Sequence, residues 1–252
     1  MAATYGSENY TVNSKTLHLK WLETTLNSST PENDELDVIN IGSDTVAGSG
    51  YYGVNSVLYD PDGSLIPFAV NKKTVVRTGG GTNGDYGCLV RLYNDLGDGT
   101  FLFCRDGAKL GTGGTLSFPF THNGYSVALN NVRWAVGGMS LRIGTTLTKP
   151  QYLDWYSGFY DPNTNRPRTA IGYKGGMKII LCTFFNTDLS TPSAGACDPW
   201  DVRTTMINKF GCSMGLNLDG GGSTAIAYKE SGTRKTHVAD SRPVRAMLTV
   251  PM

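Results

Sequence analysis

The interpretation of this chain depends on one segment, Leu216-Asn217-Leu218-Asp219-Gly220-Gly221-Gly222-Ser223-Thr224. The segment follows a predicted helix and a short apolar step, and it leads into a β-rich run that ends at Tyr228. We therefore expect it to leave the carboxyl end of a buried strand and to enter the next strand at Thr224. Functional sites collect at such strand ends.

The residue types of this segment point to an anionic ligand. Three successive glycines let a backbone approach a ligand closely, and their N–H groups can converge on an anion as a nest. Asp219 places a carboxylate before the glycines, and Ser223 with Thr224 places hydroxyl donors after them. A carboxylate beside an anion site is useful where each handles a different part of the substrate. The segment predicts a phosphate on one side and a protonatable leaving group or sugar hydroxyl on the other.

Outside this segment, most of the sequence alternates at period two with turn residues between the runs, which predicts a β-rich fold. We expect a half-buried strand over 16–21, where Leu17, Leu19 and Trp21 form the buried face and alternate with Thr16, His18 and Lys20. A second strand is expected over 36–41. We also expect two hairpins, one with strands 91–93 and 101–104 and one with strands 168–173 and 177–185.

Two helices are predicted. The clearer runs from Pro199 to Lys209, with Asp198 as N-cap, Gly211 as stop and an apolar stripe at Val202, Met206 and Phe210. The other lies around 126–131. Together these elements predict an α+β fold, a single β-rich domain over 1–252 with a mixed or antiparallel sheet and a few helices packed on it.

Charge and composition exclude several partner classes. The chain of 252 residues has 22 Lys and Arg against 21 Asp and Glu, so its net charge is +1. Such a chain has no broad basic field for a nucleic acid duplex or an anionic membrane surface, so we expect neither as partner. Glycine is frequent, with 32 residues. One cluster, 79–81, is interpreted as a surface loop, whereas 137–138 and 220–222 have more informative neighbours.

The cysteines and histidines predict neither a metal site nor a disulfide framework. Five cysteines without C-x-x-C spacing and three distant histidines do not match zinc-ligand patterns, so no metal and no cofactor are expected. The odd cysteine count favours reduced thiols. The N-terminal residues lack a basic segment followed by an apolar one, which favours a cytoplasmic protein, with a virion component as the alternative. The oligomeric state is left open.

Five blocks of sequence resemble, in order, the motifs of the phosphodiester glycosidase family. They cover residues from about 50 to 250, while residues 1–50 are unmatched and are expected to form N-terminal strands. The blocks are Gly53-Val54-Asn55-Ser56-Val57-Leu58-Tyr59-Asp60, Ala135-Val136-Gly137-Gly138, Arg168-Thr169-Ala170-Ile171-Gly172, Asn217-Leu218-Asp219-Gly220-Gly221-Gly222-Ser223 and Arg242-Pro243-Val244-Arg245-Ala246-Met247-Leu248.

The chain departs from the family pattern at specific positions. Ser56, Val57 and Leu58 stand where the family tends to have Gly-Gly-Phe, and Tyr59 replaces a usual Phe. Arg245 replaces a common Asn. If the family glycines make room for the sugar, the pocket of this chain has a different shape, which affects the expected substrate more than the expected fold.

The resemblance implies a hydrolase that cleaves a glycosidic bond to a phosphate, or a related glycoside, in a small molecule or glycan that contains a sugar phosphate. For catalysis we select Asp219 as base, nucleophile or electrostatic stabiliser, Asp60 as a second carboxylate and Arg168 as a phosphate clamp. Each has a structural alternative: Asp219 could cap its own glycine turn, Asp60 could belong to an ordinary turn, and Arg168 could form an ion pair at a strand end.

The predicted substrate-binding residues are Asn55, Asn217, Gly220, Gly221, Gly222, Ser223, Thr224, Arg242 and Gly138. Asn55 could bind a sugar hydroxyl or orient Asp219, and Arg242 could pair with phosphate or with Asp240. An alternative function is a non-catalytic carbohydrate-binding, nucleotide-binding or structural protein, for example of a phage particle, that uses the same glycine-rich pocket. A third is a protein that sequesters a nucleotide-like signal.

Overall fold

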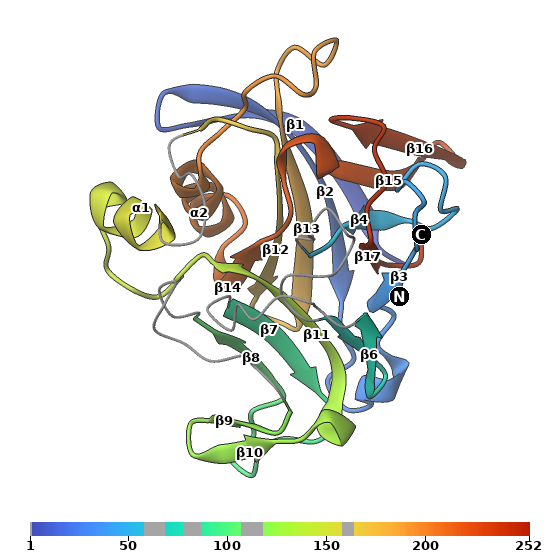
Figure 1. The fold of residues 1–252 in the computed structure, drawn as a ribbon, viewed down its shortest axis with the longest axis vertical. Helices are drawn as coiled ribbons and strands as arrows, with labels where there is room; N and C mark the ends of the chain where they lie inside the picture. The colour runs from blue at the N-terminus through green and yellow to red at the C-terminus, as the bar shows by residue number, and fades with distance from the viewer. Residues whose placement is uncertain (1, 58–68, 78–86, 107–117, 158–163) are drawn as a thin grey trace.

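The computed structural model describes residues 2–57, 69–77, 87–106, 118–157 and 164–252. Within these residues the fold is α+β and rich in strands, and every strand pairing is antiparallel (Figure 1). Asp60 and the glycine cluster 79–81 lie outside the described residues.

Ten of the described strands form the larger sheet, in which the main path runs β1-β2-β13-β12-β14-β11-β5-β6, with β7 paired to β11 and β8 paired to β7. The bounds of these strands are β1 Thr4–Val12, β2 Lys15–Thr25, β5 Ala69–Asn71, β6 Thr74–Arg77, β7 Gly87–Leu92, β8 Leu102–Arg105, β11 Val132–Ser140, β12 Arg168–Lys174, β13 Lys178–Asn186 and β14 Cys212–Asn217.

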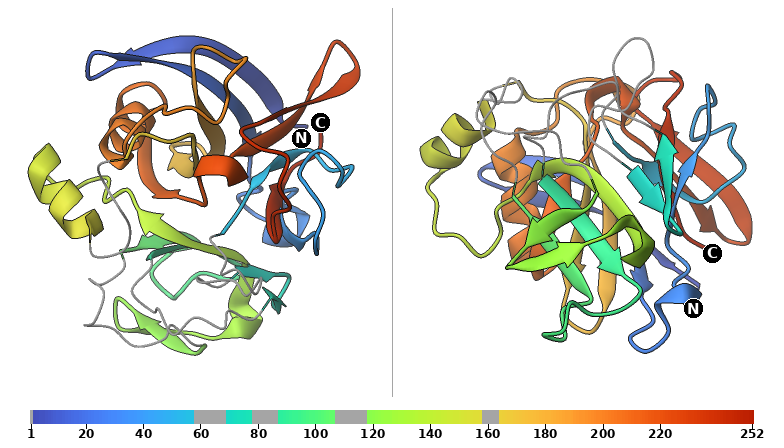
Figure 2. Two further views of the ribbon diagram at one scale, coloured as in Figure 1. Left: turned by 45° about the horizontal axis from the view of Figure 1, so that its top comes forward. Right: turned by 60° about the horizontal axis from the view of Figure 1, so that its bottom comes forward.

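A second sheet of five described strands has the order β16-β15-β4-β17-β3, and β9 pairs with β10 as a separate hairpin. Their bounds are β3 Asp37–Asn40, β4 Gly53–Asn55, β15 Ala225–Glu230, β16 Thr233–Val238, β17 Ala246–Thr249, β9 Phe120–His122 and β10 Tyr125–Val127. In both views of Figure 2 the strands β7 to β11, drawn in green, lie apart from the five-stranded sheet.

The described part of the chain has two α-helices, α1 (Lys149–Ser157) and α2 (Pro199–Asn208), which lie beside each other on the side of the molecule opposite the five-stranded sheet (Figure 1). The same residues form three short 3-10 turns, Pro31–Asn33, Leu129–Asn131 and Gly221–Ser223. No helix of the described residues is long and apolar enough to cross a bilayer.

The main core lies between the two sheets. It contains Leu22 and Leu181 from the larger sheet and Val54, Ile226 and Leu248 from the smaller one. Strand β13 is buried on both faces, because Ile179 and Leu181 face this core while the alternate residues face α2. The larger sheet is therefore a central layer, and the chain passes from it to the second sheet at the end of β14.

Several sequence predictions are confirmed. Strands β7 and β8 form one predicted hairpin, and β12 and β13 form the other. Helix α2 has Asp198 as N-cap, with a capping box to Asp201, and Gly211 follows it at φ +67°. Its residues Val202, Met206 and Phe210 pack against the sheet as predicted.

Other predictions are wrong. Residues 126–131 do not form a helix: β10 ends at Val127, and the 3-10 turn Leu129–Asn131 follows, tied in place by the Asn131 side chain, which accepts a hydrogen bond from Asn94 N–H at 3.1 Å. The first fifty residues supply β1 and β2, but β2 is not half-exposed. Lys20, expected on its polar face, is buried under the stacked rings of Tyr5 and Tyr228.

All five cysteines are free thiols, as predicted, and four of them are buried. Burial raises the pKa of Cys88 to about 12. A thiol with so high a pKa stays protonated and unreactive at neutral pH.

Candidate active site

The predicted segment lies where the chain crosses between the two sheets. Leu218 N–H still donates to Thr169 O of β12 at 2.8 Å, whereas Asp219 N–H donates to Ser56 O, just past β4, at 3.0 Å. The chain then makes the 3-10 turn Gly221–Ser223 and enters β15. Asp219 is therefore held between the sheets by its own backbone, at the end of a buried strand.

A separate reason favours glycine at each of the three positions 220, 221 and 222. A Cβ on Gly220 would lie 3.0 Å from Pro167 O, and a Cβ on Gly222 would lie 3.2 Å from Arg242 Nε. Gly221 has φ +61°, which favours glycine. The run lets the loop lie against β12 on one side and against a guanidinium on the other.

The anion nest predicted for this run is not formed, because most of its N–H groups donate within the protein. Gly220 N–H donates to Asp219 Oδ1 at 2.9 Å, and Gly221 N–H donates to Pro167 O at 2.8 Å. Ser223 and Thr224 N–H donate to carbonyls of the same loop. Four of the N–H groups are therefore already bonded within the protein, and positive charge at this site comes from side chains.

Asn55 fixes the position of Asp219. Its Nδ2 donates to Asp219 O at 2.8 Å, and its Oδ1 accepts from Thr169 Oγ1 at 2.6 Å and from Ala225 N–H at 3.0 Å. Asn55 is only 1% exposed. Of its two predicted roles, the geometry matches the orientation of Asp219.

Asp219 is a buried carboxylate with altered proton affinity. Its side chain lines a pocket, and the residue is only 8% exposed. Burial raises its pKa to about 6, against the opposing effects of hydrogen bonds from Ser223 and Gly220 and the charge of Arg242. Asp219 does cap its own turn through Gly220. Even with this cap, the pKa of Asp219 lies near the range in which acid–base groups act.

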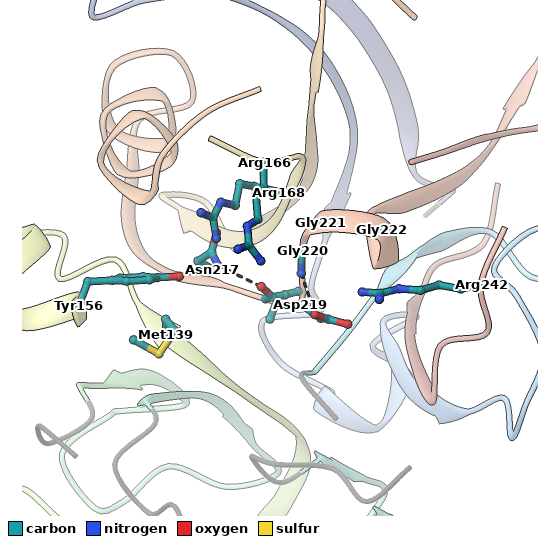
Figure 3. A pocket seen from close by; sticks show the side chains of 11 residues that line it. Met139, Tyr156, Arg166, Arg168, Asn217, Asp219, Gly220, Gly221, Gly222 and Arg242 are labelled. Carbon is teal, nitrogen blue, oxygen red and sulfur yellow. Dashed lines mark hydrogen bonds between the residues drawn. The ribbon is translucent and has the colours of Figure 1, made fainter. Parts of the chain in front are cut away.

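Three arginines line the same pocket, which has a volume of about 170 Å³. In Figure 3, Arg166 and Arg168 extend toward it from the start of β12, and Arg242 points at Asp219 from the opposite side. Arg168 donates to two backbone carbonyls, Cys197 O at 3.4 Å and Thr164 O at 3.0 Å. These are neutral acceptors, so the guanidinium keeps its charge for an anion in the pocket.

Asn217 and Tyr156 form the wall opposite Arg242 (Figure 3). Asn217 Nδ2 donates to Tyr156 Oη at 3.1 Å and to Leu218 O at 3.0 Å. Its Oδ1 is buried and has no hydrogen-bond partner among the described residues. A buried acceptor without a partner in a pocket wall suits a ligand that carries a hydroxyl or amide N–H.

The structure places the predicted site residues in two groups. One group lines the pocket: Arg168, Asn217, Asp219, Gly220, Gly221, Gly222 and Arg242. The other group supports it from behind: Asn55, Ser223, Thr224 and Gly138. A Cβ on Gly138 would lie 2.7 Å from Asn217 O, so this glycine allows β11 and β14 to approach each other rather than touching a ligand.

Sequence reasoning missed Arg166, Tyr156 and Met139, which also line the pocket. Arg166 lies two residues before Arg168, a spacing that places both on one face of an extended chain. Tyr156 lies on the unpredicted helix α1. Thr148 and Gln151 gave the capping signal for that helix, since Thr148 N–H donates to Gln151 Oε1 at 2.9 Å.

The pocket's donor groups suit an anion rather than a metal. Its lining side chains include guanidiniums, an amide and one carboxylate. No group of three His, Cys, Asp or Glu side chains that could hold a metal ion occurs among the described residues. Guanidinium groups bind phosphate through paired hydrogen bonds. The absence of a metal or cofactor requirement stays a prediction.

Comparisons with known proteins relate this chain to one family and to several solved structures. A family model described as phosphodiester glycosidase matches residues 49–250. No curated protein sequence matches the chain. The catalytic domain of zebrafish N-acetylglucosamine-1-phosphodiester alpha-N-acetylglucosaminidase, described as auto-inhibited by its pro-peptide, aligns with a TM-score of 0.64 and 13% identity over 99% of this chain and 83% of that one.

Two bacterial structures are also similar. A hypothetical protein from Synechocystis aligns with a TM-score of 0.57 and 13% identity, over 99% of this chain and 62% of that one. A Burkholderia pseudomallei K96243 protein, provisionally described as exported, aligns with a TM-score of 0.60 and 14% identity, over 95% and 75% of the two chains. At these identities the structural likeness shows the fold alone.

Proposed function

This chain belongs to the phosphodiester glycosidase family, and from that premise we propose that it hydrolyses the glycosidic bond between a sugar and a phosphate. The site of the reaction is the pocket around Asp219. The observation that carries the proposal is the convergence of one buried carboxylate and three guanidiniums on a single pocket within the family-matched residues.

Arg166 and Arg168 bind the phosphate in this proposal. A phosphodiester carries one negative charge and presents oxygens that match the planar fork of a guanidinium. The described residues line a pocket of about 170 Å³, in which the guanidiniums meet one part of the ligand. The Asn217 amide oxygen and the Tyr156 hydroxyl lie where they can contact its hydroxyl or amide groups.

Asp219 acts as an ionised carboxylate. The bond between the anomeric carbon and the phosphate oxygen breaks, the phosphate monoester leaves with the electron pair, and water adds at the anomeric carbon and gives up a proton to Asp219 or to solvent. Because phosphate leaves readily, a strong general acid is unnecessary, and the main demand is stabilisation of the positive charge that develops on the sugar. A carboxylate serves this demand as base, nucleophile or stabiliser, and each role needs the deprotonated form.

The pH dependence follows from this role. With a pKa of about 6, Asp219 is ionised above that pH and becomes protonated below it. The proposed activity therefore rises as the pH increases through about 6. Asp60, selected as a second carboxylate, lies outside the described residues and stays a prediction.

The test is release of free sugar from a panel of sugar phosphodiesters and nucleotide-linked sugars, with α-N-acetylglucosamine derivatives included. Wild-type protein should release sugar, Asp219→Ala should lose the release while it remains folded, and Arg168→Gln should raise KM for the phosphate-containing substrates. If no panel member is hydrolysed but wild type and Asp219→Ala both bind glycans, the enzymatic proposal is wrong and the non-catalytic binding function replaces it.

The proposed substrate is a small molecule or glycan that contains a sugar phosphate. A cytoplasmic location stays a prediction, since one structural relative is provisionally described as exported.

A further inference from the structure

Thr169 follows Arg168 in β12, and its side chain joins the two sheets beside the candidate active site. Its Oγ1 donates to Asn55 Oδ1 at 2.6 Å. Both residues are buried, so the bond is shielded from water. Because β12 belongs to the larger sheet and β4, which contains Asn55, belongs to the smaller one, this bond connects the sheets where Asp219 passes between them.

The direction of this bond follows from the other partners of Asn55. The Asn55 Oδ1 also accepts from Ala225 N–H at 3.0 Å, and the Nδ2 donates to Asp219 O at 2.8 Å. A backbone N–H can only donate and a backbone carbonyl can only accept. The amide therefore cannot turn over without two repulsive contacts, and Thr169 is the donor in its bond to Asn55.

Strand β12 and the residue before it hold the loop that carries the carboxylate. Leu218 N–H donates to Thr169 O, and Gly221 N–H donates to Pro167 O, each at 2.8 Å. These two carbonyls belong to the residues on either side of Arg168. The backbone that positions Arg168 is thus also bonded to the ends of the loop.

Strand β4 and the residue after it hold the Asp219 peptide itself. Asp219 N–H donates to Ser56 O at 3.0 Å, and Asp219 O accepts from Asn55 Nδ2. The carboxylate is therefore positioned from β4, whereas the Arg168 guanidinium is positioned from β12. The placement of one relative to the other depends on how β4 and β12 are joined, and the bond from Thr169 to Asn55 joins them directly.

We propose that Thr169 is a positioning residue, which acts through Asn55 to fix the Asp219 carboxylate relative to the Arg168 guanidinium. This inference rests on the proposed function, in which Arg168 binds the phosphate and Asp219 acts at the anomeric carbon of the same substrate. Thr169 does not line the pocket, so it has this effect without touching the substrate. A displacement of about 1 Å between groups that act together can cost about 100-fold in rate.

The experiment compares two substitutions of Thr169 with a matched control in the full chain. Thr169→Val replaces the hydroxyl by a methyl group and removes the bond to Asn55, whereas Thr169→Ser keeps the hydroxyl. The control is Thr183→Val. Thr183 lies directly opposite Thr169 in the pairing of β12 with β13, is also fully buried, and donates to Lys20 O at 3.1 Å. Each valine variant loses one buried hydrogen bond of the same kind, at the site in one case and away from it in the other.

Hydrolysis kinetics separate a positioning role from a loss of stability. Thr169→Val should lower kcat by about tenfold to 100-fold, while KM for phosphate-containing substrates changes little, because Arg168 keeps its place on β12. Thr169→Ser should restore kcat. Thr183→Val should leave kcat nearly unchanged, although both valine variants lower the urea midpoint to a similar extent. An equal loss of kcat in the two valine variants would show a structural role and overturn the inference.

Hydrogen exchange tests the same bond in the ligand-free protein without turnover. The reporters are Ala225 N–H, which donates to Asn55, and Asp219 N–H, which donates to Ser56. Loss of one hydrogen bond of ordinary strength should speed their exchange by about threefold to tenfold in Thr169→Val relative to Thr183→Val. Equal exchange in the two variants would mean that Thr169 does not hold Asp219, and the inference would be wrong.

The two measurements distinguish failure of the inference from failure of the proposed function. If wild type hydrolyses no substrate but exchange becomes faster in Thr169→Val as described, Thr169 does position Asp219, and it is the enzymatic proposal that fails. If wild type hydrolyses substrate and Thr169→Val keeps its kcat, the inference fails and the proposed function stands.

Discussion

Replacing Asp219 by asparagine should abolish hydrolysis and at the same time stabilise the protein at neutral and alkaline pH. Asparagine has nearly the same shape and keeps an acceptor for Gly220 N–H, which donates to Asp219 Oδ1 at 2.9 Å. It removes the negative charge, whose burial is the first cause of the raised pKa. The substitution thus isolates the free-energy cost of an ionised carboxylate at this position.

The size of this free-energy cost follows from the pKa of Asp219. Folding raises that pKa from 3.8 to about 6, and a difference of about two pKa units corresponds to about 3 kcal/mol. Below 3.8 both folded and unfolded chains are protonated, and the cost is absent. As the pH rises, the unfolded chain ionises first, so the folded state loses relative stability until about pH 6, above which the full cost is present.

The assay is urea unfolding of wild type and Asp219→Asn at constant ionic strength from about pH 4 to about pH 8. The two free energies of unfolding should be similar near pH 4, and the variant should be more stable by up to about 3 kcal/mol at pH 8. Asp98→Asn is the control, because the side chain and backbone of Thr100 lower the pKa of that exposed carboxyl below its ordinary value of 3.8. Its contribution to stability is complete above that value, so the difference from wild type should stay nearly constant from about pH 5 to about pH 8.

A difference between wild type and Asp219→Asn that does not change with pH would refute the reasoning. So would a wild type that is the more stable form at pH 8. Either result would mean that the folded protein does not disfavour the charge on Asp219.

Two further predictions concern the support of the site, and a third concerns a buried ion pair of the fold. Asn55→Ala should lower the free energy of unfolding by about 3 kcal/mol, because it leaves Asp219 O, Thr169 Oγ1 and Ala225 N–H without their partner; urea unfolding measures this, and a loss below about 1 kcal/mol contradicts the role of Asn55. Gly138→Ala should cost about 1–3 kcal/mol, since its Cβ would lie 2.7 Å from Asn217 O; an unchanged thermal midpoint argues against the close approach. Asp34→Ala should cost about 3–5 kcal/mol by leaving Arg91, its partner at 2.8 Å and fully buried, unpaired, and urea unfolding that matches wild type would show that the pair is not needed.

Local signals predicted the regular elements well where they were strong. Helix α2 carries its cap, its proline and its apolar stripe within one short segment, and the structure matches each. Helix α1 was not predicted, although Thr148 and Gln151 form a capping pair. Its buried residues Tyr152, Trp155 and Tyr156 each combine an aromatic ring with a polar group, so they do not form a clear apolar stripe in the sequence. Lys20 was placed on a polar face because alternation does not report that a second layer covers that face.

For the site, the sequence predicted residue types but not their partners. The glycine run was interpreted as an anion nest, yet Gly221 N–H donates to Pro167 O and Gly222 makes room for Arg242. Neighbours on a loop can be inferred from spacing. Neighbours across sheets cannot, because their contact depends on how two separate strands are placed.

By itself the sequence determined the β-rich α+β fold, the family motifs in their order and the location of Asp219 on a loop between two strands. These depend on local periodicity and on motifs a few residues long. Only the tertiary structure decided that Asn55 holds Asp219 across 164 positions of sequence, that Arg166, Arg168 and Arg242 surround it, and that its pKa is about 6. The physical reason is that desolvation and Coulomb interactions depend on distances in space, which chain spacing does not contain.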